Sequence, residues 1–191
     1  MQNKTVVIVC GPTAIGKTGL AIQLAEHFKT KIISADSRQC YQELTIGVAK
    51  PLDEELRQVQ HYFINSHSIH QEINAAIFEQ YALDAVQQIF QQCNIAIMVG
   101  GTGLYIKAFC EGLDNIPNIS TTIRSTIQQK YNAKGLAWLQ EQVQLKDPEF
   151  WQIAEQQNPH RLIRALEVIE ATGQSINSFR KGEKLQRSFN I

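Results

Sequence analysis

Three features are missing from the sequence: a long hydrophobic run, an excess of charge of one sign, and a cysteine motif. No apolar stretch approaches the roughly 20 residues of a membrane-spanning helix, and the run Val6–Cys10 is too short for the core of a signal peptide. The 18 basic and 18 acidic side chains cancel, which excludes a histone-like basic protein and an acidic tail protein. We therefore expect a cytoplasmic protein that does not associate with membranes.

The four cysteines form no metal-binding pattern, because no two of them are spaced as C-x₂-C or C-x₄-C: Cys10, Cys40, Cys93 and Cys110. Three lie in or near apolar runs, which is typical of buried free thiols and fits a reducing compartment. Three histidines lack a supporting carboxylate or cysteine pattern, so we interpret them as solvated loop residues: His61, His67 and His70.

The composition is that of a folded chain, with 43% apolar and 19% charged residues. Its 191 residues suit one domain, or one domain with a small appendage. Charge is divided unevenly: residues 1–115 carry 8 basic and 11 acidic side chains, and residues 116–191 carry 10 and 7. Any contact with a polyanion should therefore come mainly from the second part.

The first part alternates between strand and helix patterns. Apolar, largely β-branched runs predict strands at 6–10, 31–36 and 95–99, the first of them buried on both faces. One helix follows the first strand, with apolar residues at i, i+4 and i+8: Leu20, Leu24 and Phe28. Another covers roughly 75–92, with an inward face of Phe78, Ala82, Ala85 and Ile89. This order predicts an α/β fold, a parallel sheet with helices on both faces.

The second part is helical. Prolines in first turns, at Pro148 and Pro159, and glycine stops, at Gly135 and Gly173, delimit the helices. We expect a core over residues 1–118, an all-helical segment over 119–187, and the start of a returning core strand at 188–191, so that the chain ends within the core. Aromatic residues at helical spacing are interpreted as core rather than base-stacking residues: Trp138, Phe150 and Trp151.

The segment Gly11–Thr18 matches the P-loop pattern G-x-x-x-x-G-K-[ST] and lies between a predicted strand and a predicted helix. Its backbone N–H groups and the helix N-terminus can surround a di- or triphosphate, Lys17 adds a charge, and the Thr18 hydroxyl can hold Mg²⁺. The motif does not by itself specify ATP. The third strand ends in Gly100–Gly103 and lacks the carboxylate with which ATPases and GTPases hold Mg²⁺.

Two further features have alternative interpretations. Asp36 ends the second strand at the same sheet edge as the P-loop, where it is either a site carboxylate or a cap of the following turn. Arg161 and Arg164 lie in the first turns of a helix, where cations oppose the helix dipole. They either meet an external anion or pair with Glu155 or Glu167.

Five blocks together resemble the tRNA dimethylallyltransferase (tRNA isopentenyltransferase) family, in the same order and over nearly the whole chain. They are Gly11–Thr18 (G-P-T-A-x-G-K-T), Ile33–Tyr41 (I-S-x-D-S-x-Q-x-Y), Ile46–Pro51 (I-G-T-A-K-P), Val99–Tyr105 (V-G-G-T-G-L-Y) and His160–Val168 (Q-R-x-x-R-A-L-E-V). The resemblance implies transfer of a dimethylallyl group from dimethylallyl diphosphate to the exocyclic amine of the adenine next to the anticodon of tRNA.

The resemblance also implies the roles of residues. The diphosphate-binding residues are Gly11, Pro12, Thr13, Ala14, Ile15, Gly16, Lys17 and Thr18, with Mg²⁺ on Thr18. Asp36 is the proton acceptor, Thr13 and Lys17 stabilise the leaving diphosphate, and Thr102 lies beside the adenine. The tRNA anticodon stem-loop meets Asp36, Ser37, Arg38, Gln39, Thr102, Arg124, His160, Arg161, Leu162, Ile163 and Arg164. We expect the protein to act as a monomer.

The sequence departs from the family pattern at three positions: Val48 replaces a threonine, Asn65 replaces an aspartate, and His160 replaces a glutamine. Family members also continue for roughly another hundred residues, which a single domain plus insertion needs. Three alternatives stay open: a P-loop small-molecule kinase, a prenyltransferase acting on free adenine nucleotides, and a non-catalytic tRNA- or diphosphate-binding fragment.

Overall fold

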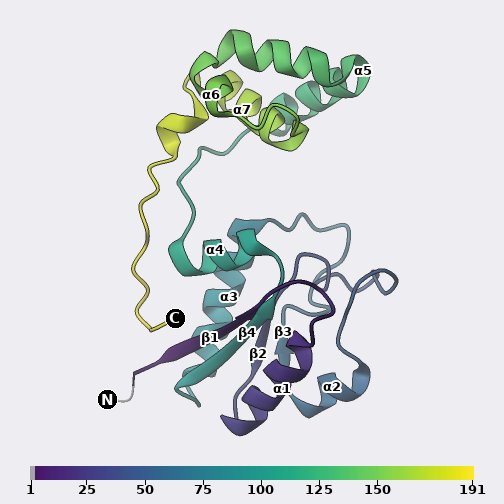
Figure 1. Ribbon diagram of the computed structural model, residues 1–191, viewed down its shortest axis with the longest axis vertical. Helices are drawn as coiled ribbons and strands as arrows, with labels where there is room; N and C mark the ends of the chain where they lie inside the picture. The colour runs from purple at the N-terminus through teal and green to yellow at the C-terminus, as the bar shows by residue number, and fades with distance from the viewer. Residues whose placement is uncertain (1–2) are drawn as a thin grey trace. The chain divides into compact units, whose positions relative to one another are not determined.

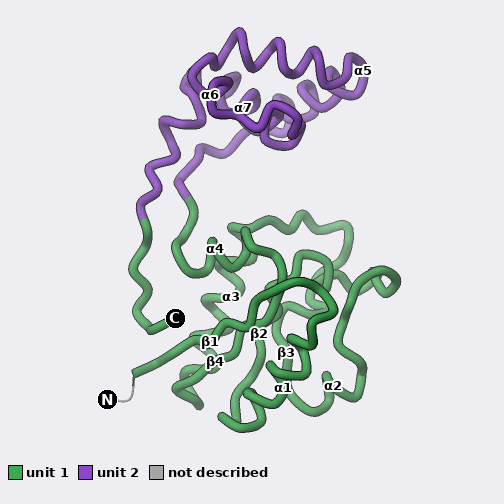
Figure 2. Tube along the Cα trace, in the orientation of Figure 1, with its two compact units in different colours: residues 1–113, 184–191 green, residues 114–183 purple. Residues whose placement is uncertain are grey.

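The computed structural model describes residues 3–191, which fall into two compact units (Figure 2). Unit 1 comprises the chain up to Leu113 together with Lys184–Ile191, and unit 2 comprises Asp114–Glu183. Each unit has its own apolar core. Within residues 3–191, no helix is both long and apolar enough to cross a membrane.

Unit 1 is built on a four-stranded parallel sheet in the order β1-β4-β2-β3 (Figure 1). The strands are β1 (Thr5–Cys10), β2 (Ile32–Ala35), β3 (His61–Tyr62) and β4 (Ile95–Gly100). β4 is paired on both sides, with Val6 opposite Ala96 and Ile33 opposite Met98. The parallel α/β fold expected from the sequence is confirmed, although the sequence did not reveal β3.

Helices pack on both faces of this sheet. One face packs against α1 (Lys17–His27) through Ile32, Ile97 and Val99. The other face packs against α3 (Ala75–Ile89) and α4 (Gly103–Glu111) through alternate strand residues such as Ile33 and Met98. The predicted inward face of α3 is confirmed, since all four of its residues are buried. A short helix, α2 (Asp53–Gln58), precedes β3.

The structure corrects two details of this packing. In α1 the buried residues are Ala21, Ile22 and Ala25, whereas Leu20 and Phe28 are exposed and Leu24 is half-buried. The face of α1 that packs on the sheet is therefore formed by two alanines and Ile22, and the leucine spacing marked the wrong face. β1 is less buried than expected, because it lies at the edge of the sheet: Val6 is buried, Cys10 is exposed, and the residues between them are half-buried.

The chain returns to unit 1 along an extended segment held by Arg187. The guanidinium of Arg187 donates to the Phe109 carbonyl (2.7 Å), the Ala108 carbonyl (2.8 Å) and the Glu79 carboxylate (2.6 Å). The ring of Phe189 stacks on that of Phe109, and Asn190 forms a single parallel bridge with Thr5 on the free edge of β1. The segment expected at 188–191 thus forms one bridge, and no strand longer than that, within the described residues.

Unit 2 is all-helical, with α5 (Thr121–Lys146), α6 (Pro148–Ile153), α7 (Pro159–Thr172) and a 3₁₀ turn at Ile176–Phe179. α5 consists of two helical segments that meet at Gly135, whose φ of 75° lies outside the helical region. Asp147 and Asn158 cap α6 and α7 with their side chains, and Gly173 ends α7 in the left-handed conformation, as expected. Phe150 is buried in this core, against which Trp138 and Trp151 pack, which confirms their interpretation.

Gly100 brings the carboxyl ends of three strands together. It lies opposite Cys10 of β1 and Ala35 of β2. A Cβ atom on Gly100 would lie 2.2 Å from the carbonyl oxygen of Ala35, a distance that only a backbone shift could relieve. The absence of a side chain at this position therefore sets the separation of β2 and β4 where both strands end.

We predict that Gly100→Ala lowers the free energy of unfolding by about 3 kcal/mol, at the upper end of overpacking costs, because rigid backbone must move. Gly101→Ala is the matched control, since its Cβ would meet only the Gly11 carbonyl oxygen at 3.5 Å. Urea unfolding of the two variants and the wild type is the measurement. Equal stability of the two variants would contradict the prediction.

Candidate functional site

The P-loop Gly11–Thr18 connects β1 to α1 in the predicted context. Gly16 precedes α1 with a φ of 88°, a left-handed conformation that favours glycine, and provides no side-chain cap. Ala14 also has a positive φ, 66°, which is uncommon for a residue with a side chain and is typical of strained functional loops. The loop thus presents backbone N–H groups and a helix N-terminus, the two elements of an anion site.

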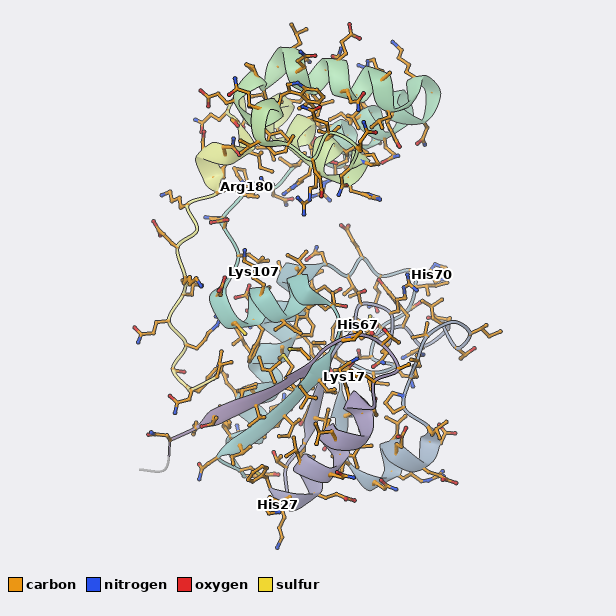
Figure 3. All side chains as sticks on the ribbon, viewed as in Figure 1. Lys17, His27, His67, His70, Lys107 and Arg180 are labelled. Atoms are coloured by element: carbon orange, nitrogen blue, oxygen red, sulfur yellow. The ribbon has the colours of Figure 1, made fainter. Side chains whose placement is uncertain are left out.

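Behind the P-loop lies a phosphate cavity of ≈ 290 Å³, defined by its lining residues Lys17, Thr18, Asp36, Glu55 and Gly100 among others. The ammonium of Lys17 donates a 2.5 Å hydrogen bond to the Pro12 carbonyl oxygen of the same loop. Figure 3 shows Lys17 at the start of α1. Its charge therefore lies at the loop, where it can bind a phosphate oxygen in place of the carbonyl.

Asp36 follows β2, caps the following turn and lines the phosphate cavity. Its Oδ1 accepts hydrogen bonds from the backbone N–H groups of Arg38 (2.9 Å) and Gln39 (3.3 Å), which caps the following turn. Among residues 3–191, no hydrogen bond reaches its Oδ2. Asp36 also lines the phosphate cavity. One oxygen therefore orients the carboxylate, and the other is available to a ligand.

A second cavity, the Thr102 cavity of ≈ 380 Å³, lies next to the first. It is lined by Arg38, Val48 and Thr102, among others, and shares Thr13 and Asp36 with the phosphate cavity. Thr102 is held at this position because its Oγ1 accepts a hydrogen bond from the Ser37 N–H (3.0 Å) and its own N–H donates to the Ala35 carbonyl (3.1 Å). The two cavities thus meet at Thr13 and Asp36.

The loop 46–51 is attached to this site by Gln39. Ser34 Oγ donates to Gln39 Oε1 (2.8 Å), and Gln39 Nε2 donates to the Ala49 carbonyl (2.6 Å). Both ends of the Gln39 amide are thus used inside the protein, so Gln39 positions the loop. Asn65, one of the departures from the family pattern, accepts a 2.6 Å hydrogen bond from the Lys50 ammonium, where a carboxylate would form an ion pair.

The phosphate cavity is also lined by Glu55 of α2, which the sequence did not single out, and by His61 of β3, which was expected to be a solvated loop residue. His61 is half-buried rather than a solvated loop residue; its Nδ1 bonds the Val59 carbonyl (2.8 Å), and its Nε2 is buried without a partner. Burial lowers the pKa of His61 below its usual value. His67 is half-buried and packs against Phe63, and of the three histidines only His70 is exposed as expected. Because β3 contains two residues, no periodic signal could have revealed it.

The remaining site candidates lie in unit 2, where the ion pairs considered for the arginines are formed. Arg161 pairs with Glu155 (3.3 Å), and both side chains are more than half exposed. Arg164 pairs with Glu167 (3.2 Å), and Arg124 Nε lies 3.9 Å from the same carboxylate. Leu162 is fully buried in the core of unit 2, which is incompatible with a side-chain contact to RNA. Ile163 is half-buried, and His160 is exposed.

A parallel sheet, a strand–P-loop–helix unit and helices on both sheet faces define a P-loop α/β protein. The sequence also matches the family model described as IPP transferase over residues 39–191. The chain belongs to this family.

Curated relatives agree with this assignment. The chain is 41% identical to tRNA dimethylallyltransferase 1 of Bacteroides fragilis, covering 100% of this chain and 64% of the relative. It is 45% identical to the tRNA dimethylallyltransferase of Christiangramia forsetii, covering 99% of this chain and 62% of the relative. The chain therefore spans less than two thirds of the length of these relatives.

Two solved structures share the fold. One is the tRNA isopentenylpyrophosphate transferase of Bacillus halodurans, with a TM-score of 0.57 and 31% identity, covering 90% of this chain and 57% of that one. The other is a eukaryotic dimethylallyltransferase acting on tRNA, with a TM-score of 0.76 and 23% identity, covering 99% and 47%. At that identity, the second likeness supports the fold alone.

We predict that Lys17→Ala weakens binding of inorganic pyrophosphate at least tenfold, because a hydrogen bond between charged groups contributes about 1.5–3 kcal/mol. Isothermal titration calorimetry measures this affinity. Lys4→Ala is the control, since Lys4 is an exposed cation of unit 1 that lies over the Phe90 ring and does not line the phosphate cavity. Equal affinities of the Lys17 variant and the wild type would exclude the P-loop as the anion site.

Proposed function

We propose that this chain is the catalytic part of an enzyme that transfers a dimethylallyl group from dimethylallyl diphosphate to the exocyclic amine of the adenine next to the anticodon in tRNA. The observation that carries the proposal is the position of Asp36 and Thr13 where the phosphate cavity meets the Thr102 cavity. A reaction between a diphosphate and a base needs a donor site and an acceptor site that share a proton acceptor. The names of the relatives supply the reaction.

In the proposed step the adenine amine nitrogen forms a bond to the first carbon of the allyl group, and the bond from that carbon to the diphosphate oxygen breaks. The diphosphate leaves with the bonding electrons. The amine proton passes to Asp36 Oδ2, while the Oδ1 hydrogen bonds to Arg38 and Gln39 hold the carboxylate in place. A general base held this way typically contributes 10²–10⁴-fold to the rate.

The P-loop stabilises the charge that develops on the leaving diphosphate. The Lys17 ammonium, the Thr13 hydroxyl and the loop N–H groups are arranged around the phosphate cavity before the ligand binds, which is the condition for strong electrostatic stabilisation. The hydroxyl of Thr18 and the carboxylates of the cavity are hard oxygen donors of the kind that Mg²⁺ prefers. We propose that Thr18 holds Mg²⁺, which when bound neutralises diphosphate charge.

The acceptor base occupies the Thr102 cavity in this proposal. The base must leave its stack to enter, as in other enzymes that modify bases. Ser37, Arg38 and Thr102 contact the nucleotide there, and Gln39 positions the adjacent loop. In unit 2, Arg124, His160, Arg161 and Arg164 contact the stem-loop, whereas Leu162 and Ile163 anchor α7. Both cavities come from one chain with free thiols, so we propose a monomer acting in the reducing cytoplasm.

A small-molecule kinase is less well supported by the site. β4 ends at Gly100 and is followed by Gly101 and Thr102, so no carboxylate stands where P-loop kinases hold the metal of ATP. Transfer to free adenine nucleotides is the remaining enzymatic alternative. An assay that offers the anticodon stem-loop, AMP and ATP in parallel distinguishes transfer to tRNA, transfer to free adenine nucleotides and a kinase that consumes ATP.

We predict that Asp36→Asn lowers transfer of the radiolabelled dimethylallyl group to an unmodified anticodon stem-loop by 10²–10⁴-fold in single turnover. Asparagine keeps an oxygen that can cap the turn, so folding, pyrophosphate affinity and RNA affinity should be retained. A near-normal single-turnover rate of transfer by the variant would mean that Asp36 only caps the turn and does not accept the proton. Failure of the wild-type chain to transfer, although both substrates bind, would contradict the proposed function of this chain.

We predict that Arg161→Gln flattens the salt dependence of stem-loop binding by about one contact, a log–log slope change of roughly 0.7–0.9. Its pair with Glu155 is exposed and therefore weak, so a phosphate can replace the carboxylate. Glu155→Gln is the opposite control, because releasing Arg161 should strengthen binding. The measurement is filter binding against salt concentration, with pyrophosphate affinity unchanged in both variants. If log affinity plotted against log salt concentration gave the same line for the wild type and both variants, Arg161 would only pair with Glu155 and would not contact RNA.

A further inference from the structure

A third cavity of unit 1 is not used by the reaction described above. This cavity, here called the α4 groove, has a volume of ≈ 680 Å³ and lies between the ends of β1 and β4 and the helix α4. Its lining includes Cys10, Gly101, Ile106, Lys107 and Cys110. A volume of this size is typical of small-molecule sites.

One face of α4 lines the groove. Gly103, Ile106, Lys107 and Cys110 recur at i, i+3, i+4 and i+7, whereas the opposite face, with Tyr105, Ala108 and Phe109, is buried in the core. The middle of this wall consists of the Ile106 side chain, a thiol and glycine backbone. Lys107, visible on α4 in Figure 3, adds a cation, and Glu111, which pairs with Lys184, adds a carboxylate. Apart from this cation and this carboxylate, the groove is lined by the Ile106 side chain, two thiols and glycine backbone, whereas the phosphate cavity is lined by Lys17 and two carboxylates.

The α4 groove borders the phosphate cavity along glycine backbone. Gly100 and Gly101 line both the phosphate cavity and the α4 groove, and Gly101 also lines the Thr102 cavity. Three cavities thus meet around Gly101, and the proposed reaction assigns an occupant to only two of them. The allylic diphosphate has a charged end and a base-facing carbon, and its hydrocarbon chain needs a third, apolar space.

On the basis of the proposed function, we propose that the α4 groove binds the hydrocarbon chain of the allylic diphosphate, with Cys10, Ile106 and Cys110 as its wall. The groove is larger than a five-carbon chain requires, so a ten-carbon chain also fits. Each additional methylene that is buried should tighten binding about fourfold. Geranyl diphosphate should accordingly bind this chain more tightly than dimethylallyl diphosphate, and both more tightly than pyrophosphate.

The cysteines of the chain provide a direct test. Cys10 is exposed in the groove and should react with N-ethylmaleimide. Cys40 is buried, and burial raises its pKa to about 11, so it should stay unreactive. Cys93 lies outside the groove, where its thiol donates to the Lys29 carbonyl, and serves as the internal control. Mass spectrometry follows the labelling of each cysteine in the wild-type chain with saturating pyrophosphate, dimethylallyl diphosphate or geranyl diphosphate.

The proposal expects geranyl diphosphate to slow alkylation of Cys10 at least fivefold more than pyrophosphate does, with Cys93 unchanged. Equal protection of Cys10 by the three ligands would overturn the proposal, because the hydrocarbon chain of the ligand would then lie outside the α4 groove. The pyrophosphate site and the proposed function would still stand in that case. If calorimetry shows that none of the three ligands binds, the proposed function fails, and this inference fails with it.

A variant pair gives an independent check. Ile106→Trp fills the groove and should weaken geranyl diphosphate binding at least tenfold while leaving pyrophosphate affinity unchanged. Leu104→Trp places the same side chain on an exposed position of α4 outside the groove and should change neither affinity. Similar geranyl diphosphate affinities for these two variants would also overturn the proposal.

Discussion

The close approach of β2 and β4 at Gly100 is the constraint on which the site depends. Because Gly100 has no side chain, the Ala35 carbonyl can reach the backbone of β4 and accept a hydrogen bond from the Thr102 N–H. This contact places the end of β2, with Asp36, beside the glycine backbone that all three cavities share. Asp36 therefore lines both the phosphate cavity and the Thr102 cavity.

Local signals in the sequence predicted the parts of the fold that local physics determines. The P-loop, the strands β2 and β4, the inward face of α3 and the capped starts of α6 and α7 each depend on residues close together in the chain. The rest depends on partners distant in sequence. The side of α1 that packs on the sheet is the side that carries its alanines. Cys10 is exposed because β1 lies at the edge of the sheet. Arg187 binds carbonyl groups that lie 78 and 79 residues earlier in the chain. No spacing rule reveals these contacts.

Two arginines of unit 2 face the same buried acid, Glu167. Glu167 is 8% exposed and faces two guanidiniums, those of Arg164 and Arg124, which limit the cost of burying its carboxylate. Arg161 is different, because its partner Glu155 is exposed and solvent already screens the pair. Two arginines three residues apart on one helix therefore differ in how easily they can exchange their carboxylate partner for an external anion.

The fastening of the returning segment has an evolutionary consequence. Leu185 N–H donates to the Glu111 carbonyl, the Leu185 side chain packs against Gly112, and Arg187 holds the carbonyls at the end of α4. The chain thus leaves unit 1 at the end of α4 and rejoins it at a neighbouring point. These contacts within unit 1 do not involve the helical insert between them. Since the entropy of closing a loop grows only slowly with its length, the helical insert can be lengthened, shortened or exchanged during divergence at little cost to the core. Unit 1 and the helical insert can in this way diverge at different rates.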